Sequence, residues 1–366
     1  MEEMMKKVLV TGGAGFIGSN LAQSLLQNDG EYEIHAFDNL HPQVHRDEGW
    51  PQLLPTEVTL HTGDVANEGN WDTVLKLVRP DIVVHLAAET GTGQSLTEST
   101  RHGNVNVVGT TVMLDALNRN NVKPEHIILA SSRAVYGDGM WQSEDGSTFY
   151  PGSRSHDMLE AGQWDYTDKS GQRAHAVAMR ADLVEPRPTN IYAATKLAQE
   201  HIIRAWTTAY SVPFTVLRFQ NVYGPGQSLE NSYTGILALF SRLSYNKQPI
   251  DVYEDGQIVR DFVYVNDVVQ SIVKSIERPP KAAEVRTLDI GSGTPCTVLE
   301  VAQKLSTLAG APEPGISGKY RDGDVRAASC DISVTRETIG YEPEWPLDRG
   351  LAGLYDWVKE TSSSES

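Results

Sequence analysis

The chain of 366 residues carries a formal net charge of −17 and contains only two cysteines. A chain of this length can bury a large core without disulfides, so we expect one large α/β domain with a smaller second lobe. The acidic balance argues against nucleic acid and anionic membrane surfaces as partners. The few cysteines, and the lack of any apolar run of about 18 residues, predict a cytoplasmic protein without a membrane span.

The N-terminal segment combines a short apolar run with regularly spaced glycines. Residues 7–11 are typical of a buried parallel strand, and Gly12, Gly15 and Gly18 follow it. Such glycines allow a tight turn, let backbone N–H groups approach a pyrophosphate and let the next helix pack closely on the strand. Residues 16–27 have helical apolar spacing, and the dipole of that helix would face the phosphates. The pattern predicts a dinucleotide site.

An acidic residue indicates which dinucleotide binds. Residues 32–37 are predicted to form a second strand, and Asp38 and Asn39 follow it without an arginine immediately after them. A carboxylate at this point can accept hydrogen bonds from the ribose hydroxyls of NAD and would repel the 2′-phosphate of NADP. We therefore predict that NAD is the cofactor.

Strands and helices continue to alternate along the chain. Strands are predicted over residues 57–61, 81–86 and 126–130, with a helix over 107–118. This alternation predicts a Rossmann-type doubly wound parallel sheet, whose ligands lie at the carboxyl ends of the strands. There Asp64 could accept a hydrogen bond from the adenine or cap a helix, and small residues would let the nicotinamide come close. The candidate cofactor residues are Gly12, Gly15, Phe16, Ile17, Gly18, Asp38, Asn39, Asp64, Val65, Leu86, Ala87 and Ala88.

A tyrosine and a lysine stand four residues apart, at Tyr192 and Lys196. On a helix, two residues with this spacing share one face. The ammonium would favour the phenolate and lower the pKa of Tyr192 from its ordinary value near ~10 toward working pH. A tyrosine in that state can take or give a proton. The pair is therefore a candidate for proton transfer beside the cofactor, although an isolated pair of this kind is more often a tyrosine that packs on a lysine stem.

Several blocks of sequence, taken in order, resemble the extended short-chain dehydrogenase/reductase family, in its nucleotide-sugar epimerase/dehydratase branch. The likeness covers essentially the whole chain, and it looks closest to the dTDP-L-rhamnose 4-epimerase-like members. The blocks are TGGAGFIG at 11–18, HLAA at 85–88, SSRAVYG at 131–137, YAATK at 192–196, RFQNVYGPG at 218–226 and RDFVYVNDV at 260–268.

The resemblance implies a role for each matching residue. Tyr192 would be the catalytic base and acid and would also contact the cofactor. Lys196 would bind the nicotinamide ribose and lower the pKa of the tyrosine. Ser132, at the end of the fifth predicted strand, would orient the sugar hydroxyl. Asn221 would contact the substrate near its phosphate.

Three arginines resemble the diphosphate clamp of the family. A guanidinium fork matches phosphate oxygens, which is the physical reason for arginine at such a site. Each of them could instead be an ion-pair partner at the surface. These residues are Arg260, Arg321 and Arg326.

The chemistry implied by the resemblance is transient oxidation of a nucleotide sugar to its 4-ketone. The family's 4,6-dehydratases carry an Asp-Glu pair where this chain has Arg133 and Ala134, neither of which can act as the acid or base of dehydration. The nucleotide-uronate decarboxylases keep a glutamate at the position of Ala134. Arg133 could pair with a substrate carboxylate or with a carboxylate in the wall of the site.

We therefore expect a dTDP- or UDP-hexose 4-epimerase. An NDP-glucuronate decarboxylase and an NDP-4-keto-sugar reductase stay open as alternatives. A more remote one is an NAD-sensing regulator without catalysis, although such proteins usually lose the tyrosine or the lysine.

Residues 138–188 form a connection that is longer than is usual in the family. The segment is rich in glycine, serine and charged residues, with tryptophans and tyrosines interspersed. Loops this long are usually functional or disordered. The segment has no cysteine, and His156 and His175 are a poor basis for zinc, so no metal is expected. We predict a lid over the sugar pocket, with a solvated surface loop as the alternative.

The rest of the chain is predicted to build a smaller mixed α/β lobe that binds the nucleotide sugar. Its predicted elements are a helix over 231–245, strands over 249–253 and 288–291, and a helix through residue 308 whose Thr297 and Glu300 could form a capping box. By resemblance, the helices near 100–118 and 191–210 would form a homodimer. The expected division is 1–190 for the NAD-binding domain with its insert, 191–225 for the catalytic helix and return strand, 226–360 for the substrate lobe and 361–366 for a disordered tail.

Overall fold

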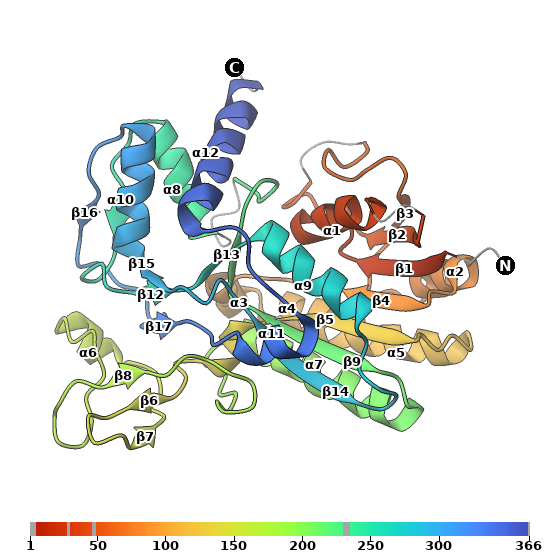
Figure 1. The fold of residues 1–366 in the computed structure, drawn as a ribbon, viewed down its shortest axis with the longest axis horizontal. Coiled ribbons are helices and arrows are strands. Elements are labelled where there is room, and N and C mark those ends of the chain that lie inside the picture. Colours follow the sequence, from red (N-terminus) through yellow and green to blue (C-terminus); the bar gives the residue numbers. More distant parts are fainter. Residues whose placement is uncertain (1–4, 28–29, 46–48, 230–234, 365–366) are drawn as a thin grey trace.

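The computed structural model describes residues 5–27, 30–45, 49–229 and 235–364. Within these ranges, seven parallel strands form the central sheet in the order β14-β9-β5-β4-β1-β2-β3 (Figure 1). The chain leaves β1 toward β2 and β3 on one side and then crosses to β4 on the other, which places the ligand crevice at the carboxyl ends of β1 and β4. The strands are β1 (Lys6–Thr11), β2 (Tyr32–Asp38), β3 (Thr59–Thr62), β4 (Ile82–His85), β5 (His126–Ser132), β9 (Phe214–Phe219) and β14 (Val285–Ile290).

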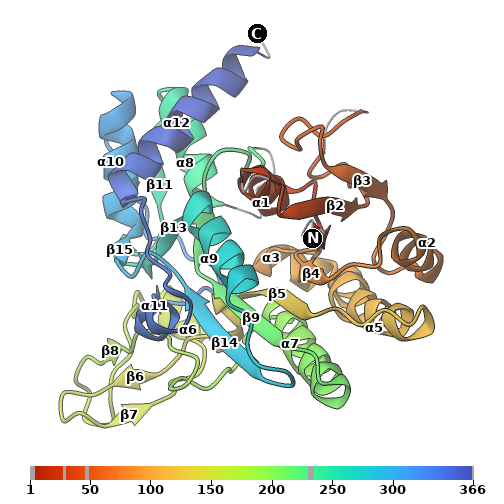
Figure 2. The same ribbon diagram turned by 45° about the vertical axis from the view of Figure 1, so that its right-hand side comes forward.

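Helices cover both faces of this sheet, so the predicted Rossmann-type fold is confirmed. Side chains on β1 alternate between two apolar cores: Val8 and Val10 face one, and Leu9 faces the other. One face carries α1 (Phe16–Leu26) and α9 (Val265–Glu277), and the other carries α2 (Glu68–Val78), α5 (Gly109–Arg119) and α7 (Ile191–Tyr210) (Figure 2).

Most predicted elements are present with shifted ends. The strand predicted over 57–61 is β3, which begins at Thr59. The helix predicted over 107–118 is α5, and a π-helical turn and two shorter helices precede it. These upstream elements are α3 (Thr92–Thr97), α4 (Ser99–His102) and η1 (Gly103–Val108).

The C-terminal lobe lies beside the nucleotide half, and three of its helices pack on one another (Figure 1). The predicted capping box is confirmed, because Glu300 N donates to Thr297 Oγ1 at 3.1 Å and Thr297 N donates to Glu300 Oε2 at 2.7 Å. The predicted helix over 231–245 is α8, and residues 231–234 lie outside the described residues. The elements are β10 (Asn221–Tyr223), α8 (Ile236–Tyr245), β11 (Asp251–Val252), β12 (Val259–Arg260), β13 (Phe262–Tyr264), β15 (Cys296–Thr297), α10 (Val298–Ala309), β16 (Gly315–Ile316), β17 (Ala327–Ala328), α11 (Ser333–Ile339) and α12 (Leu347–Ser364).

The structure corrects two of the expected boundaries. Strand β14 pairs with β9 as the edge of the central sheet, and α9 packs against α1, so both belong to the nucleotide half although they were expected in the substrate lobe. The expected disordered tail is helical over 361–364, because α12 continues to Ser364; residues 365–366 are outside the described ranges.

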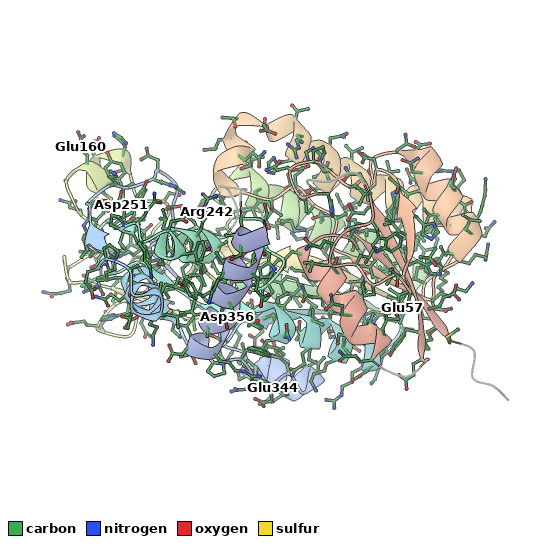
Figure 3. All side chains as sticks on the ribbon, turned by 90° about the horizontal axis from the view of Figure 1, so that it is seen from above. Glu57, Glu160, Arg242, Asp251, Glu344 and Asp356 are labelled. Carbon is green, nitrogen blue, oxygen red and sulfur yellow. The ribbon has the colours of Figure 1, made fainter. Side chains whose placement is uncertain are left out.

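The insert, residues 138–188, folds into a small unit of its own. It contains the antiparallel strands β6 (Trp141–Gln142), β7 (Thr148–Phe149) and β8 (His175–Ala176), together with helix α6 (His156–Glu160). Trp141 and Tyr166 pack edge to face at 4.8 Å between ring centroids and form its core with Ala174. The unit lies next to the C-terminal lobe, and Glu160 of α6 lies at the opposite end of the molecule from Glu57 (Figure 3).

Candidate active site

The turn between β1 and α1 is closely packed, as the glycine pattern predicts. Gly12 has a φ of 68°, and a Cβ atom there would lie 2.8 Å from the backbone nitrogen of Ala87. A Cβ atom on Gly18 would lie 2.5 Å from the carbonyl oxygen of Gly12. Larger residues would therefore push the helix away from the turn and the turn away from β4.

A cavity of about 300 Å³ opens beside this turn. No described side chain caps the N-terminus of α1, so its first N–H groups are open to an anion. The composition of the wall fits the dinucleotide NAD, with glycine backbone at one end and a carboxylate for the ribose. Of the predicted cofactor residues, the cavity is lined by Gly12, Gly15, Phe16, Ile17, Gly18, Asp38, Asn39, Val65, Leu86, Ala87 and Ala88.

Asp38 is held at the wall of this cavity by backbone groups. Its Oδ2 accepts from the N–H of Ala14 at 3.1 Å, and its Oδ1 accepts from the N–H of Leu40 at 2.9 Å. Asp64, in contrast, does not line the cavity: its Oδ1 accepts from the N–H of Ala66 at 2.7 Å and closes a turn. A role for Asp64 at the adenine is therefore not supported, and its neighbour Val65 lines the cavity instead.

Sequence reasoning missed the segment that faces the glycine turn across the cavity. Residues 41 and 43–45, after β2, line it together with Arg101. Gln43 Nε2 donates to Gln94 Oε1 at 3.2 Å, and Arg101 Nη2 donates to Gln43 Oε1 at 3.1 Å and pairs with Glu89 at 2.9 Å. These bonds join the loop after β2 to α3 and α4. No local pattern signals them, because the partners are far apart in the sequence.

A second cleft, of about 450 Å³, brings most of the predicted substrate residues together. It lies between the ends of β5 and β10, the start of α7 and the C-terminal lobe. Tyr192 is positioned by the cap of α7, where Asn190 accepts from the N–H of Ala193 at 2.9 Å. The predicted residues that line the cleft are Ser132, Arg133, Tyr192, Asn221, Arg260 and Arg321.

The charges around Tyr192 differ from the expectation. Burial raises the pKa of Tyr192 above its ordinary value, while the hydrogen bond with Ser132 and the charge of Arg133 lower it. Lys196 is 2 % exposed, and burial lowers its own pKa to about 7, with Glu200 acting in the opposite direction. The prediction that Lys196 lowers the pKa of Tyr192 is therefore wrong when only the groups of this chain are counted. Burial makes the charged form of Lys196 unfavourable, so it cannot act as a strong positive charge beside Tyr192.

Arg133 points its charge into the cleft without a carboxylate partner. Its Nε donates to Oδ1 of Asn221 at 3.2 Å, and no ion pair joins it to any described carboxylate. Burial lowers its pKa from the ordinary value, and Asp324, Tyr192 and Asp138 oppose that shift. The alternative of a salt bridge within the described wall is thus not observed.

The two other arginines of the cleft are held in different ways. Arg260 Nη1 and Nη2 donate to the carbonyl oxygens of Val259 and Val325 at 2.8 and 2.9 Å, and burial lowers its pKa to about 9. The guanidinium of Arg321 lies 5.3 Å from the ring centroid of Tyr253, which also lines the cleft. Both arginines keep donors for an anionic ligand.

Arg326 is not part of the cleft, which corrects its expected role in the diphosphate clamp. Its side chain is 3 % exposed and is surrounded by carboxylates. It pairs with Asp165 at 2.8 Å, Glu254 at 3.0 Å and Asp255 at 2.7 Å. Its donors are therefore used within the protein, and it acts as a buried ion-pair centre.

The described residues contain no group of three or more His, Cys, Asp or Glu side chains that could hold a metal ion. None of the described helices has both the length and the apolar character that crossing a bilayer needs.

Comparison with known proteins agrees with this geometry. A dTDP-L-rhamnose 4-epimerase of Burkholderia thailandensis is 50 % identical over 355 residues, covering 97 % of this chain and 95 % of that protein. The crystal structure of UDP-glucuronic acid 4-epimerase from Bacillus cereus, in complex with UDP-glucuronic acid and NAD, is similar at a TM-score of 0.78 and 25 % identity, covering 97 % of this chain and 99 % of that one.

UDP-glucose 4-epimerase from Thermotoga maritima, solved with UDP-glucose, has a TM-score of 0.77 and 26 % identity to this chain, with 97 % and 99 % of the two chains covered. The sequence model of the NAD dependent epimerase/dehydratase family matches residues 8–157 and 166–291. Tyr192 lines the second cleft, whereas Lys196 lines neither this cleft nor the cavity beside the glycine turn. The family match covers most of the chain, and the cavity has glycine backbone and a carboxylate in its wall, so the chain belongs to the NAD-dependent epimerase/dehydratase family, and NAD is its cofactor.

Proposed function

We propose that this chain is a 4-epimerase of dTDP-L-rhamnose. The observation that carries the proposal is the cleft in which Tyr192 and Ser132 stand beside Arg133 and Ala134, with no acid or base at the last two positions. The relative with 50 % identity bears the name of this activity. Arg260 and Arg321 line the same cleft and suit the diphosphate of such a substrate.

Each residue of the cleft has a task in this reaction. Tyr192 takes the proton of the sugar's C4 hydroxyl when the carbon is oxidised and returns it when the ketone is reduced. Ser132 forms a hydrogen bond with Tyr192, and its hydroxyl would hold the same sugar oxygen. Lys196 lies one helical turn beyond Tyr192 on α7 and would bind the nicotinamide ribose. Bound NAD supplies the hydride acceptor and donor for both steps.

The neighbouring side chains favour epimerisation over the alternative outcomes. Dehydration needs an acid and a base near the ketone, and Arg133 and Ala134 provide neither. The related decarboxylases keep a glutamate at the position of Ala134, and an alanine cannot replace it as an acid or base. A keto sugar that loses neither water nor carbon dioxide can turn in the cleft and be reduced on its other face.

The test is conversion of dTDP-L-rhamnose, followed by chromatography, mass measurement and proton NMR. The proposal predicts a new isomer of unchanged mass, with an inverted configuration at C4 only. Tyr192→Phe should lower the rate about 10²–10⁴-fold, the range for loss of a general acid-base group, while bound NAD is retained. Loss of carbon dioxide from a UDP-uronate, or of water from a dTDP- or UDP-hexose, together with no conversion of dTDP-L-rhamnose would overturn the proposal. Equal behaviour of wild type and Tyr192→Phe toward every dTDP- and UDP-sugar would instead favour an NAD-sensing regulator.

We also propose a cytoplasmic homodimer formed through α5 and α7. Val108, just before α5, is 44 % exposed and Tyr210, at the end of α7, is 46 % exposed. Apolar side chains on adjacent helices suit a partner surface. Light scattering should give twice the mass of the chain, and Tyr210→Glu should shift the protein toward the monomer. A monomeric wild type at working concentration would contradict this assembly.

A further inference from the structure

One arginine of the insert holds two segments of the substrate lobe together. The side chain of Arg154 is 1 % exposed and forms a double ion pair with Glu254, with both N–O distances at 2.8 Å. Its Nη2 also donates to the carbonyl oxygen of Asp324 at 2.7 Å. A single planar guanidinium therefore fixes the turn after β11 and the loop before β17 relative to each other.

Both of these segments form walls of the sugar cleft. Tyr253 precedes Glu254 and lines the cleft, as do Arg321 and Asp324 on the opposite segment. The guanidinium of Arg321 lies over the Tyr253 ring at 5.3 Å. Arg154 itself does not line the cleft, so it contacts the two walls from behind.

The turn after β11 has an unusual backbone conformation at Glu254, and several contacts hold it in place. Glu254 has a φ of 54°, in the left-handed region that residues other than glycine adopt rarely. Its carboxylate is 1 % exposed and accepts from Arg154 and also from Arg326 at 3.0 Å. Its N–H donates to the carbonyl oxygen of Lys319 at 2.7 Å. The ion pairs therefore stabilise a turn that the backbone alone would disfavour.

The insert also contacts the loop before β17 through other side chains. His156 Nδ1 lies 3.1 Å from Oδ1 of Asp322. The ring of Tyr320 packs against the rings of His156 and Trp164, with centroids at 5.8 and 6.2 Å. The insert thus contacts residues on both sides of Arg321.

We propose that the insert positions the walls of the substrate cleft, with Arg154 as the positioning residue that aligns Tyr253 and Arg321 for the nucleotide diphosphate. This inference rests on the proposed function only in taking the cleft as the nucleotide-sugar site. It replaces the expected lid, since the cleft is lined by no residue of the insert. The insert acts on affinity for the nucleotide sugar, whereas the NAD cavity lies outside its contacts.

The test compares Arg154→Met with Arg154→Lys and with the control Lys169→Ala. Arg154→Met leaves Glu254 paired with Arg326, so the buried carboxylate keeps one partner. Arg154→Lys keeps the charge but cannot reach both carboxylate oxygens and Asp324 together. Lys169 is exposed on the same insert, and its replacement removes the same charge.

We expect Arg154→Met to raise the KM for dTDP-L-rhamnose about tenfold or more, with kcat within about twofold of wild type and an unchanged content of bound NAD. Calorimetry with dTDP alone should show the same loss of affinity. Arg154→Lys should fall between Arg154→Met and wild type, and Lys169→Ala should match wild type. Hydrogen exchange should rise at residues 319–326 in Arg154→Met and stay unchanged at residues 12–18.

Three results would overturn the inference: an unchanged KM in Arg154→Met, a parallel loss of NAD, or a loss confined to kcat. If Arg154→Met does not fold, His156→Ala decides, because this histidine side chain is 62 % exposed and its removal breaks only the contacts with the loop. A KM raised about two- to threefold supports the inference, and an unchanged KM refutes it. Failure of wild type to bind or convert any nucleotide sugar would overturn the proposed function instead.

Discussion

Arg133 Nε donates a hydrogen bond to Asn221 Oδ1 across 3.2 Å, which joins the segment after β5 to the start of β10. Both residues line the sugar cleft, and Arg133 lies close enough to Tyr192 to lower its pKa. The position that carries an acid in the related dehydratases thus carries a cation here. We infer that Arg133 stabilises the phenolate form of Tyr192 and holds the sugar end of the substrate.

Arg133→Met should therefore lower kcat/KM for dTDP-L-rhamnose about 10–100-fold, because it removes a hydrogen-bond donor and a charge from the site of proton transfer. The pH at which the rate reaches half its maximum should rise, since the Tyr192 pKa loses a group that lowers it. The measurement is a pH–rate profile together with calorimetry of dTDP binding. An equal loss of affinity for dTDP alone would place Arg133 at the diphosphate and contradict a role at the sugar.

Gly18→Ala should strongly reduce NAD binding. The added Cβ atom would lie 2.5 Å from Gly12 O and 2.6 Å from Gly13 Cα, so α1 would have to move away from the turn that faces the pyrophosphate. The matched control is Gly103→Ala, also in a helical segment, where a Cβ atom would meet nothing within 4 Å. The measurement is bound NAD per chain after purification and the Kd for added NAD. Equal NAD content in the two variants would contradict close packing at this turn.

The free energy of unfolding should fall as the pH drops from about 6.5 to about 3, in part through His126. This side chain is 2 % exposed on β5, and burial lowers its pKa from 6.5 to about 3, with the charge of Arg286 adding to the shift. Between these values the unfolded chain binds a proton that the folded protein does not bind. The slope for one such group is up to ~1.4 kcal/mol per pH unit.

His126→Gln should remove this slope, so its free energy of unfolding relative to wild type should rise as the pH falls. Urea unfolding at pH 7.5 and pH 5 measures the difference. His175→Gln, at an exposed position of the insert, is the control and should follow wild type. A difference between His126→Gln and wild type that is the same at both pH values would show that His126 does not titrate in this way.

The parts of the fold and site that depend on neighbours in the sequence could be predicted. The glycine turn, the strand that ends at Asp38 and the helix that carries Tyr192 and Lys196 are all local patterns, because a turn, a strand or one helical turn involves only a few consecutive residues. The end of β5 likewise indicated Ser132, since the ends of parallel strands meet at one edge of the sheet.

The predictions that were wrong concern residues whose partners lie far away in the sequence. Arg326 looked like a phosphate ligand until the fold placed Asp165, Glu254 and Asp255 around it. The insert was expected to cover the cleft, but its own aromatic core and the ion pair of Arg154 hold it against the substrate lobe. Side-chain charges alone do not reveal such pairings.

Residue types and short-range spacing were enough to predict the Rossmann-type fold, the preference for NAD and the tyrosine–lysine pair. The tertiary structure decided which arginines are open to a substrate, how burial changes the pKa of Tyr192 and Lys196, and where the insert lies. These properties depend on which charges and apolar groups surround a side chain after folding. Coulomb interactions and desolvation act through space, so they depend on distances that only the folded chain defines.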